Sequence, residues 1–305
     1  MFKKTAPIIL ALFVVSSLFG LARKPGLWAI YDANFANAKY VDLTHAFSPT
    51  IPVWAGFGHA KFKPCRAGID WPGYVSKGDV FEYEKHGFIA TAYELPTDQY
   101  GTQLDPPAHF YPKGATIDQL PATYCIRPLV VIDVHEKVEK EPDYHCTLDD
   151  IKAWETKYGE IPEGSVVMIR SDQSKKWPTK AFEEHLPGIT LDALKYLHEE
   201  RHILFHGHEC LDTDTTGAMI GETWLLTHNY CQAEGVANLW MVPETGALIA
   251  VGYAKPMGGT GGYARYIAIC PPDWEYGVSI DEAPGAPLPE DNPLHWDEEK
   301  GMRVR

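Results

Sequence analysis

The segment Asp98–Phe110 places the strongest constraint on what this chain can fold into. It contains two Gln, two Asp and one His around a Gly-Thr turn and a Pro-Pro pair. Pro106 and Pro107 fix φ and remove two backbone donors, which excludes a regular helix or a central strand at this point. A stiff, irregular segment that presents oxygen and nitrogen groups in quick succession suits a metal or acid–base site. The alternative is a polar surface loop with a Pro-stiffened turn.

The same segment resembles the signature of the cyclase family of metal-dependent hydrolases, of the kynurenine formamidase-like and isatin hydrolase-like type. That signature reads His-x-Gly-Thr-His-x-Asp-x-Pro-x-His. It is matched here by Gly101, Thr102, Asp105, Pro107 and His109. Residues 41–54, 165–171 and 222–239 are similar to the family's opening strand and loop, its central strand and its second ligand segment. The resemblance therefore covers the chain from about Tyr40 to Cys270.

The resemblance implies a divalent metal ion, but this chain departs from the usual ligands. The resemblance implies metal ligands at Gln99, Gln103, Asp105 and Glu222. It also implies a catalytic role in the same site for Glu234. An alternative register places Ala237 where Glu234 stands. Oxygen ligands favour manganese, magnesium or calcium over zinc, and we expect manganese first. Loss of the metal is the alternative, although three carboxylates without a cation would repel one another.

His109 is the one histidine of the signature that this chain keeps. The resemblance implies that it acts as the general base when a metal-activated water attacks a carbonyl group, because a neutral imidazole suits that task. A structural histidine that hydrogen-bonds a loop carbonyl is the alternative interpretation.

A second polar cluster, His206-Gly207-His208-Glu209, follows a β-rich run. If the strand continued, the two histidines would share one side of it and could bind metal or substrate, with His208 as the candidate substrate contact. A polar turn is the alternative. Four aromatic residues are candidate walls of a substrate pocket, or else ordinary core residues. They are Trp54, Phe57, Tyr100 and Trp224.

The first residues predict export. Lys3 and Lys4 precede an apolar run at 8–19, which is followed by small residues at positions 20 and 22 and is shorter than the roughly 20 residues of a membrane span. We expect a signal peptide at 1–22, a periplasmic or secreted protein, and no membrane contact after cleavage. An uncleaved N-terminal anchor is the alternative.

The net charge restricts the possible binding partners of the chain, and the cysteine content restricts its possible disulfides. A formal charge of −14 without a basic stripe argues against binding to nucleic acid. The six cysteines are dispersed, and in an oxidising compartment we expect one or two disulfides at most. The family resemblance implies a homodimer or homotetramer that acts on a small-molecule substrate.

We expect one hydrolase domain at 23–270 and an extended C-terminal arm at 271–305 that docks on the body or on a neighbouring subunit, with a solvated terminus as the alternative. Helices are predicted after Thr147 and after Thr190. Apolar β-rich runs occur at 88–93, 129–134, 166–169, 202–205, 247–252 and 263–269. Strands with few intervening helices predict an α/β body around a closed or mixed sheet. The resemblance implies a swivelling β/β/α fold with a β-barrel-like core flanked by helices.

Three functions fit these observations. The first is an exported, metal-dependent hydrolase that acts on the carbon–nitrogen bond of a small amide, lactam or related compound. The second is a binding protein of the cyclase fold with a degenerate metal site. The third is a hydrolase that acts on a non-amide small molecule.

Overall fold

The computed structural model describes residues 26–214, 218–280 and 285–305. The chain divides into a short N-terminal unit that ends at Asn37 and a main unit from Ala38 to Arg305. In the N-terminal unit, α1 (Leu27–Ile30) is followed by a π-helical turn, η1 (Tyr31–Phe35). The predicted signal peptide, residues 1–22, lies outside the described residues. Within the described parts of the chain, no helix has the length and apolar character needed to cross a membrane.

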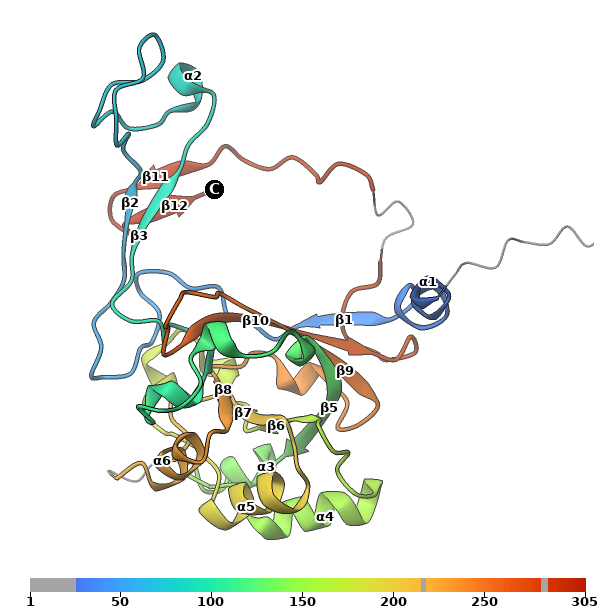
Figure 1. The fold of residues 1–305 in the computed structure, drawn as a ribbon. Helices are drawn as coiled ribbons and strands as arrows, with labels where there is room; N and C mark the ends of the chain where they lie inside the picture. The colour runs from blue at the N-terminus through green and yellow to red at the C-terminus, as the bar shows by residue number, and fades with distance from the viewer. Residues whose placement is uncertain (1–25, 215–217, 281–284) are drawn as a thin grey trace, which may run out of the picture. The chain divides into compact units, whose positions relative to one another are not determined.

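The core of the main unit is a closed seven-stranded barrel (Figure 1). Its strands are β4 (Gln103–Asp105), β5 (Ile126–Asp133), β6 (Val166–Arg170), β7 (Phe205–His208), β8 (Cys231–Glu234), β9 (Ala247–Tyr253) and β10 (Gly262–Cys270). The order around the barrel is β10-β4-β8-β7-β6-β5-β9, and β9 pairs again with β10. An eighth strand, β1 (Lys39–Asp42), pairs antiparallel with β10. The predicted β-barrel-like core flanked by helices is therefore confirmed.

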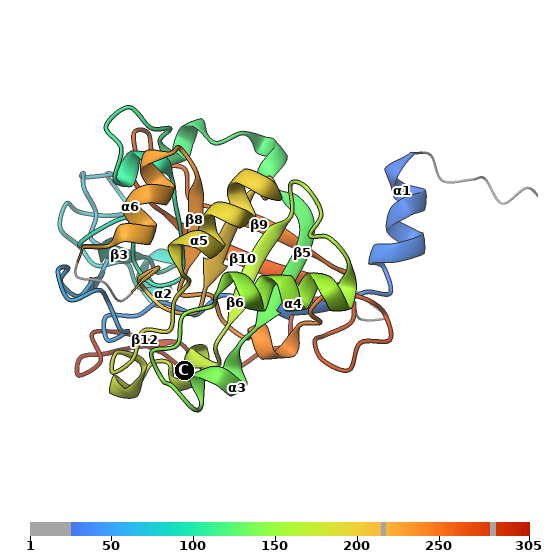
Figure 2. The same cartoon turned by 90° about the horizontal axis from the view of Figure 1, so that it is seen from below.

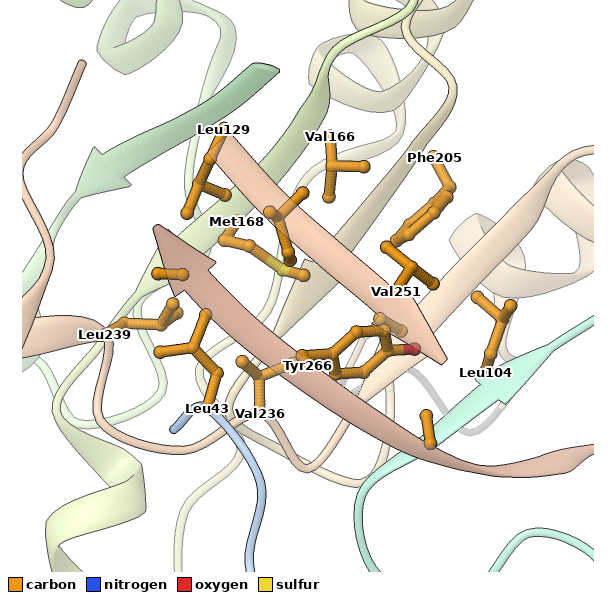
Figure 3. Packing of buried hydrophobic residues seen from close by; sticks show 14 of the residues in the cluster. Leu43, Leu104, Leu129, Val166, Met168, Phe205, Val236, Leu239, Val251 and Tyr266 are labelled. Carbon is orange, nitrogen blue, oxygen red and sulfur yellow. The ribbon is translucent and has the colours of Figure 1, made fainter. Parts of the chain in front are cut away.

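Alternation along the strands separates the barrel interior from its outer face. Because successive side chains of a strand point to opposite faces, Val166 and Met168 enter the interior while Val167 and Ile169 face outward. Figure 3 shows the interior side chains packed together, with Phe205 and Tyr266 among the largest. Each fully buried side chain of this size stabilises the fold by about 1.5–3 kcal/mol.

Helices cover the outer face of the parallel strands. The α-helices are α3 (His135–Val138), α4 (Leu148–Tyr158), α5 (Leu191–Lys195), which continues as the π-helical turn η7 (Tyr196–Glu200), and α6 (Ile220–Thr227). Figures 1 and 2 show α4 and α5 along the barrel side formed by β5 and β6. Thr147 and Asp150 form the capping box predicted at the start of α4. The helix predicted after Thr190 is also confirmed.

Short turns and hairpins complete the main unit. The 3-10 turns are η2 (Pro107–His109), η3 (Ile117–Gln119), η4 (Ala122–Tyr124), η5 (Gln173–Lys176), η6 (Lys180–Phe182) and η8 (Leu239–Met241). Two hairpins lie outside the barrel sheet: β2 (Lys61–Pro64) with β3 (Thr91–Glu94), which flank the short α2 (Tyr83–His86), and β11 (His295–Asp297) with β12 (Met302–Val304). At the start of the C-terminal arm the Trp274 indole N–H donates to the carbonyl of Met241 at 2.7 Å. Near its end Arg303 donates to Thr91 of β3.

Three sequence-based expectations need correction. The strand predicted at 88–93 begins at Thr91, after the left-handed Gly87 that ends α2. The strand predicted at 202–205 is β7, which begins at Phe205 and continues through His208. All six cysteines are unpaired, so the expected one or two disulfides are wrong. Cys231 and Cys270 belong to the barrel core instead, where a free thiol packs as a small apolar group.

His198 in η7 should make the fold sensitive to acid. Its side chain is buried beside Tyr230, both ring nitrogens lack a hydrogen-bond partner, and burial lowers its pKa to about 3. The unfolded chain takes up this proton below about pH 6.5, whereas the folded chain does not, so stability falls as the pH drops from about 6.5 toward 3. The free energy of unfolding of wild type should fall between pH 7 and pH 4.5. In His198→Phe we expect this fall to be smaller by on the order of 2 kcal/mol.

Urea unfolding of both proteins at the two pH values measures this difference. His295→Gln, at an exposed position of β11, serves as the matched control. An equal loss of stability in wild type and His198→Phe would show that another group accounts for the acid sensitivity.

Candidate active site

The candidate site lies on the outer face of three neighbouring strands, β4, β8 and β7. Leu104 and Ala233 point into the barrel, so their chain neighbours Gln103, Asp105 and Glu234 point outward. In the antiparallel register Gln103 lies opposite Glu234, and Asp105 lies opposite Gln232. Directly opposed side chains of paired strands are in contact. Alternation and register together therefore gather two carboxylates and two amides in one place.

The Gly-Thr turn of the signature fixes the start of β4. Gly101 has φ +76°, a left-handed conformation that L side chains rarely adopt. The Thr102 hydroxyl donates to the carbonyl of Gly235 at 2.6 Å and accepts the backbone N–H of His45 at 2.9 Å. Gly235 must also lack a side chain, because a Cβ there would lie 2.9 Å from the carbonyl oxygen of Gly101. These contacts fix the position of β4 against the end of β8.

The third carboxylate comes from a helix. Glu222 lies in the first turn of α6 and is buried. The first turn is anchored from outside the helix, because the Asp214 carboxylate accepts the backbone N–H of Gly221 at 2.6 Å. Gly221 has no room for a side chain, since a Cβ there would lie 2.9 Å from that same carboxylate. Glu222 is thereby directed toward the outward face of β4 and β8.

Asp105, Glu222 and Glu234 form what we call the acidic triad. Each offers one carboxylate oxygen, and these oxygens all lie within 4.8 Å of one another. All three residues are buried, and burial is the main reason that the pKa of each carboxyl is raised. The charge of Asp105 raises the pKa of the two glutamates further. Without a compensating group, the three carboxylates cannot all ionise.

Two glutamine amides supply hydrogen bonds to the acidic triad. The Gln103 Nε2 donates to Glu234 at 2.8 Å and lies 3.4 Å from Asp105. The Gln232 Nε2 lies 2.8 Å from Glu222, 3.1 Å from Glu234 and 3.3 Å from Asp105. The orientation of the Gln232 amide is fixed by Thr213, because the Gln232 Oε1 accepts a hydrogen bond from the Thr213 hydroxyl. These amides offset part of the repulsion among the carboxylates.

The acidic triad fits a divalent cation. In the described part of the chain, Asp105 Oδ1 and Gln103 Oε1 are buried oxygens with no hydrogen-bond partner. Such orphaned acceptors are costly unless a donor or an ion satisfies them. Three carboxylates together with an amide oxygen make the all-oxygen ligand set that hard divalent cations prefer. The sequence-based assignment of Gln103, Asp105 and Glu222 to one site therefore has a geometric counterpart, although their role as ligands stays a prediction.

Gln99 is placed differently from Gln103. Its Nε2 lies 2.8 Å from the carbonyl oxygen of Thr260 and 3.2 Å from the Nδ1 of His109, while its Oε1 accepts the hydroxyl of Thr97. His109 ends the η2 turn that follows β4, and burial lowers the pKa of its imidazole. Gln99 thus contacts the signature histidine, and its predicted role as a metal ligand stays a prediction.

His206 and His208 lie within β7, so the interpretation of this segment as a polar turn is wrong. They share the outer face of the strand, and His206 lies opposite Gln232 in the register. The His208 Nε2 lies 3.2 Å from the Thr213 hydroxyl and 3.7 Å from a Glu234 oxygen. Gly207 between them faces the interior, where a Cβ would lie 2.5 Å from the Met168 sulfur. His208 therefore lies against Glu234, behind the acidic triad, and its role as a substrate contact stays a prediction.

A pocket of about 280 Å³ opens above the acidic triad. Its polar lining includes Gln99, Gln103, His109, Glu222 and Glu234. Its apolar lining consists of Val53, Trp54, Phe57, Phe110, Leu211 and Met219. This volume is at the small end of the range for ligand sites and suits a small, flat molecule.

Two of the four predicted aromatic walls lie elsewhere. The Trp54 and Phe57 rings line the pocket, with their centroids 5.2 Å apart. Tyr100 is not among the residues that line this pocket; its ring is buried in a cluster with Ile51 and Ala60, and its hydroxyl donates to the Ser48 carbonyl at 2.9 Å. Trp224 packs with the helices on the far side of α6 from the acidic triad. A ring close to the motif in sequence can point into the core, because neighbouring residues face opposite sides.

Sequence reasoning missed Gln232. It lies two residues before Glu234 in the run Cys-Gln-Ala-Glu of β8, where polar and apolar residues alternate. That alternation was the available signal, because residues two apart on a strand share a face. Thr213, Thr97 and Thr260 had no comparable signal, since their roles depend on contacts between distant segments.

Known proteins resemble this chain in sequence and in structure. The Cyclase family model matches residues 41–215, which include the signature. An isatin hydrolase from Roseibium aggregatum is 32% identical over an alignment of 215 residues, and the match covers 63% of this chain and 80% of that protein. Isatin hydrolase A from Ralstonia solanacearum superposes with a TM-score of 0.69 at 27% identity, covering 81% of this chain and 98% of the other. An isatin hydrolase bound to the product analogue thioisatinate gives 0.65 at 26% identity, covering 81% and 97%. With its motif, its barrel and these matches, the chain belongs to the Cyclase family.

Proposed function

We propose that this protein is a metal-dependent hydrolase that opens the carbon–nitrogen bond of a small, flat cyclic amide such as isatin. The observation that carries the proposal is the acidic triad at the base of a pocket with aromatic walls. The similarity to isatin hydrolases supports the substrate class. A flat bicyclic lactam suits a pocket of about 280 Å³ whose lining includes Trp54 and Phe57.

Asp105, Glu222 and Glu234 would hold the cation, with the Gln103 Oε1 as a further oxygen ligand. A divalent cation bound there would polarise the substrate carbonyl and lower the pKa of water. Because the donors are oxygens, we place manganese first, ahead of magnesium and calcium, with zinc the least favoured.

The pocket residues orient the substrate. Val53, Trp54 and Phe57 form an apolar surface on which a flat ring packs. His109 lines the same pocket, so its side chain can reach the reacting carbonyl group. The general-base role expected for His109 from the sequence stays a prediction.

A binding protein without catalysis is the second candidate. The observation that favours it is the placement of the Gln103 and Gln232 amide nitrogens against all three carboxylates. Such donors partly substitute for a cation. Metal analysis of the purified protein separates the two candidates, because a binding protein of this kind would contain no bound cation and would not hydrolyse isatin.

The sequence supports three further parts of the proposal. The first is export to the periplasm or the medium, directed by residues 1–22. The second is assembly of the mature protein as a homodimer or homotetramer. The third concerns the substrate, for which a non-amide small molecule is the alternative to a lactam. Size-exclusion chromatography with light scattering measures the assembly, and N-terminal sequencing of exported protein locates the cleavage site.

Adding metal should reverse the order of stability of Glu222→Gln and wild type. In chelator the variant should be at least as stable as wild type, because one of three repelling carboxylates becomes a neutral amide. With manganese at a hundredfold excess over its dissociation constant, wild type should gain roughly 2–3 kcal/mol by mass action, and the variant much less. Denaturant unfolding with and without metal measures both quantities. A metal-free variant that is clearly less stable than wild type would contradict the repulsion among the carboxylates.

Asp105→Ala should abolish both metal content and isatin hydrolysis. The change removes a fully buried carboxylate from the centre of the acidic triad. Elemental analysis and the loss of isatin absorbance measure the two effects. Asp273→Ala, at an exposed position of the C-terminal arm, is the matched control. Near-normal metal in Asp105→Ala would remove Asp105 from the ligand set.

His109→Ala should keep its metal but lose activity. Because the imidazole acts on reacting atoms and is not part of the acidic triad, we expect isatin turnover to fall by about 10²–10⁴-fold. Metal content and steady-state kinetics on the same preparation measure the two effects. Unchanged turnover would show that His109 has no direct part in the reaction.

A further inference from the structure

We propose that Gln99 holds His109 in the neutral tautomer with its proton on Nε2, so that His109 acts on the substrate as a hydrogen-bond donor and not as a general base. The assignment of the tautomer depends only on contacts within this chain. Its catalytic consequence rests on the proposed function.

The orientation of the Gln99 amide is fixed at both ends. Its Nε2 lies 2.8 Å from the backbone carbonyl oxygen of Thr260, which can only accept a hydrogen bond. Its Oε1 accepts the hydroxyl of Thr97. Turning the amide over would bring two oxygens together at Thr260. The group that Gln99 presents to its other neighbour, His109, is therefore an N–H.

The Thr260 carbonyl is itself held in place. The Asp98 Oδ2 accepts the backbone N–H groups of Thr260 and Gly261 at 2.7 and 2.8 Å, which fixes the loop between β9 and β10. Gly261 has no room for a side chain, because a Cβ there would lie 2.8 Å from the Gln99 Nε2. The loop is thus shaped around the Gln99 amide.

This orientation determines where the proton of His109 lies. The Gln99 Nε2 is 3.2 Å from the His109 Nδ1. Because Gln99 donates, Nδ1 must present its lone pair, and a proton on Nδ1 would point at another N–H. A neutral imidazole carries one N–H, so that proton is on Nε2. The imidazolium form is disfavoured for the same reason.

The consequence for catalysis is a change of role. With Nδ1 engaged by Gln99, the nitrogen left for the pocket is a donor, suited to the carbonyl oxygen of a substrate as negative charge develops on it. In amide hydrolysis, water then adds to the carbonyl carbon and releases its proton to the solvent in the pocket. The carbon–nitrogen bond breaks as solvent returns a proton to the leaving nitrogen. His109 keeps its own proton throughout.

The direct test is the protonation pattern of His109 in ¹⁵N-labelled full-length protein loaded with magnesium, which is diamagnetic. Long-range ¹H–¹⁵N correlation spectra at neutral pH distinguish the two tautomers, and the signals absent from His109→Asn identify His109 among the 13 histidines. We expect the proton on Nε2 in the wild type. A proton on Nδ1, or on both nitrogens, would overturn the proposal without any variant of Gln99.

Variants of Gln99 test whether it sets the tautomer. In Gln99→Glu a carboxylate replaces the donor, so the proton should move to Nδ1. Gln99→Met has a similar length but neither donates nor accepts, and should give a mixture of both tautomers. Gln103→Glu makes the same chemical change four residues on, where the amide faces the acidic triad, and should leave the His109 pattern unchanged. A wild-type pattern in Gln99→Glu would overturn the proposal.

Metal affinity separates this role from that of a ligand. Calorimetric titration with magnesium should give nearly the same dissociation constant for Gln99→Met and wild type, whereas a loss of about tenfold or more would identify Gln99 as part of the metal site and overturn the proposal. With isatin as the probe, Gln99→Glu should lower kcat by about 10²–10³-fold, as for loss of a donor to the oxyanion, with little change in KM. Unchanged kcat in a variant with a switched tautomer would overturn the donor role. Absence of isatin hydrolysis in the wild type would instead refute the proposed function and leave the tautomer measurement intact.

Discussion

Mutual repulsion among three buried carboxylates is the constraint on which the site is built. Asp105, Glu222 and Glu234 lie where water cannot screen them, and burial alone would favour their neutral forms. Two amides and the anchored first turn of α6 hold them together nonetheless. An arrangement that costs folding free energy persists when it serves a ligand, and a divalent cation is the ligand that matches this charge.

The barrel makes this arrangement possible through strand alternation. The same segments, β4, β7 and β8, direct one set of side chains into the apolar interior and the other set to the outer face. Gly207 shows how closely the two faces are linked, because its missing side chain leaves room for the Met168 sulfur inside while its neighbours support the site outside. A change in interior packing at this point would displace β7 and the histidines behind the acidic triad. Stability and site geometry therefore depend on the same strands.

The sequence predicts those parts of the molecule that depend on local chemistry or on the signature. The capping box at Thr147 specified α4, and the family resemblance brought Asp105, Glu222 and Glu234 into one site although they are far apart in the chain. What the sequence could not reveal depends on three-dimensional register. Gln232 matters because it lies opposite Asp105, and Tyr100 is absent from the pocket lining because its ring is buried against Ile51 and Ala60. All six cysteines are unpaired and four of them are buried thiols, which the expected oxidising compartment did not indicate.

The two glutamines of the signature show how one substitution can have different consequences at two positions. An amide carries a donor and an acceptor and does not titrate near neutral pH, so its neighbours decide which end it presents. At Gln103 the neighbours are one carboxylate on the same strand and one on the adjacent strand, and the amide oxygen is left without a partner. At Gln99 a backbone carbonyl and a hydroxyl occupy both ends of the amide, and the remaining N–H faces an imidazole. The first environment is consistent with binding a cation, whereas the second directs the protonation of a histidine. Residue type alone therefore does not define the role of a ligand position in this family, because the hydrogen-bonding groups around it decide which atom it offers.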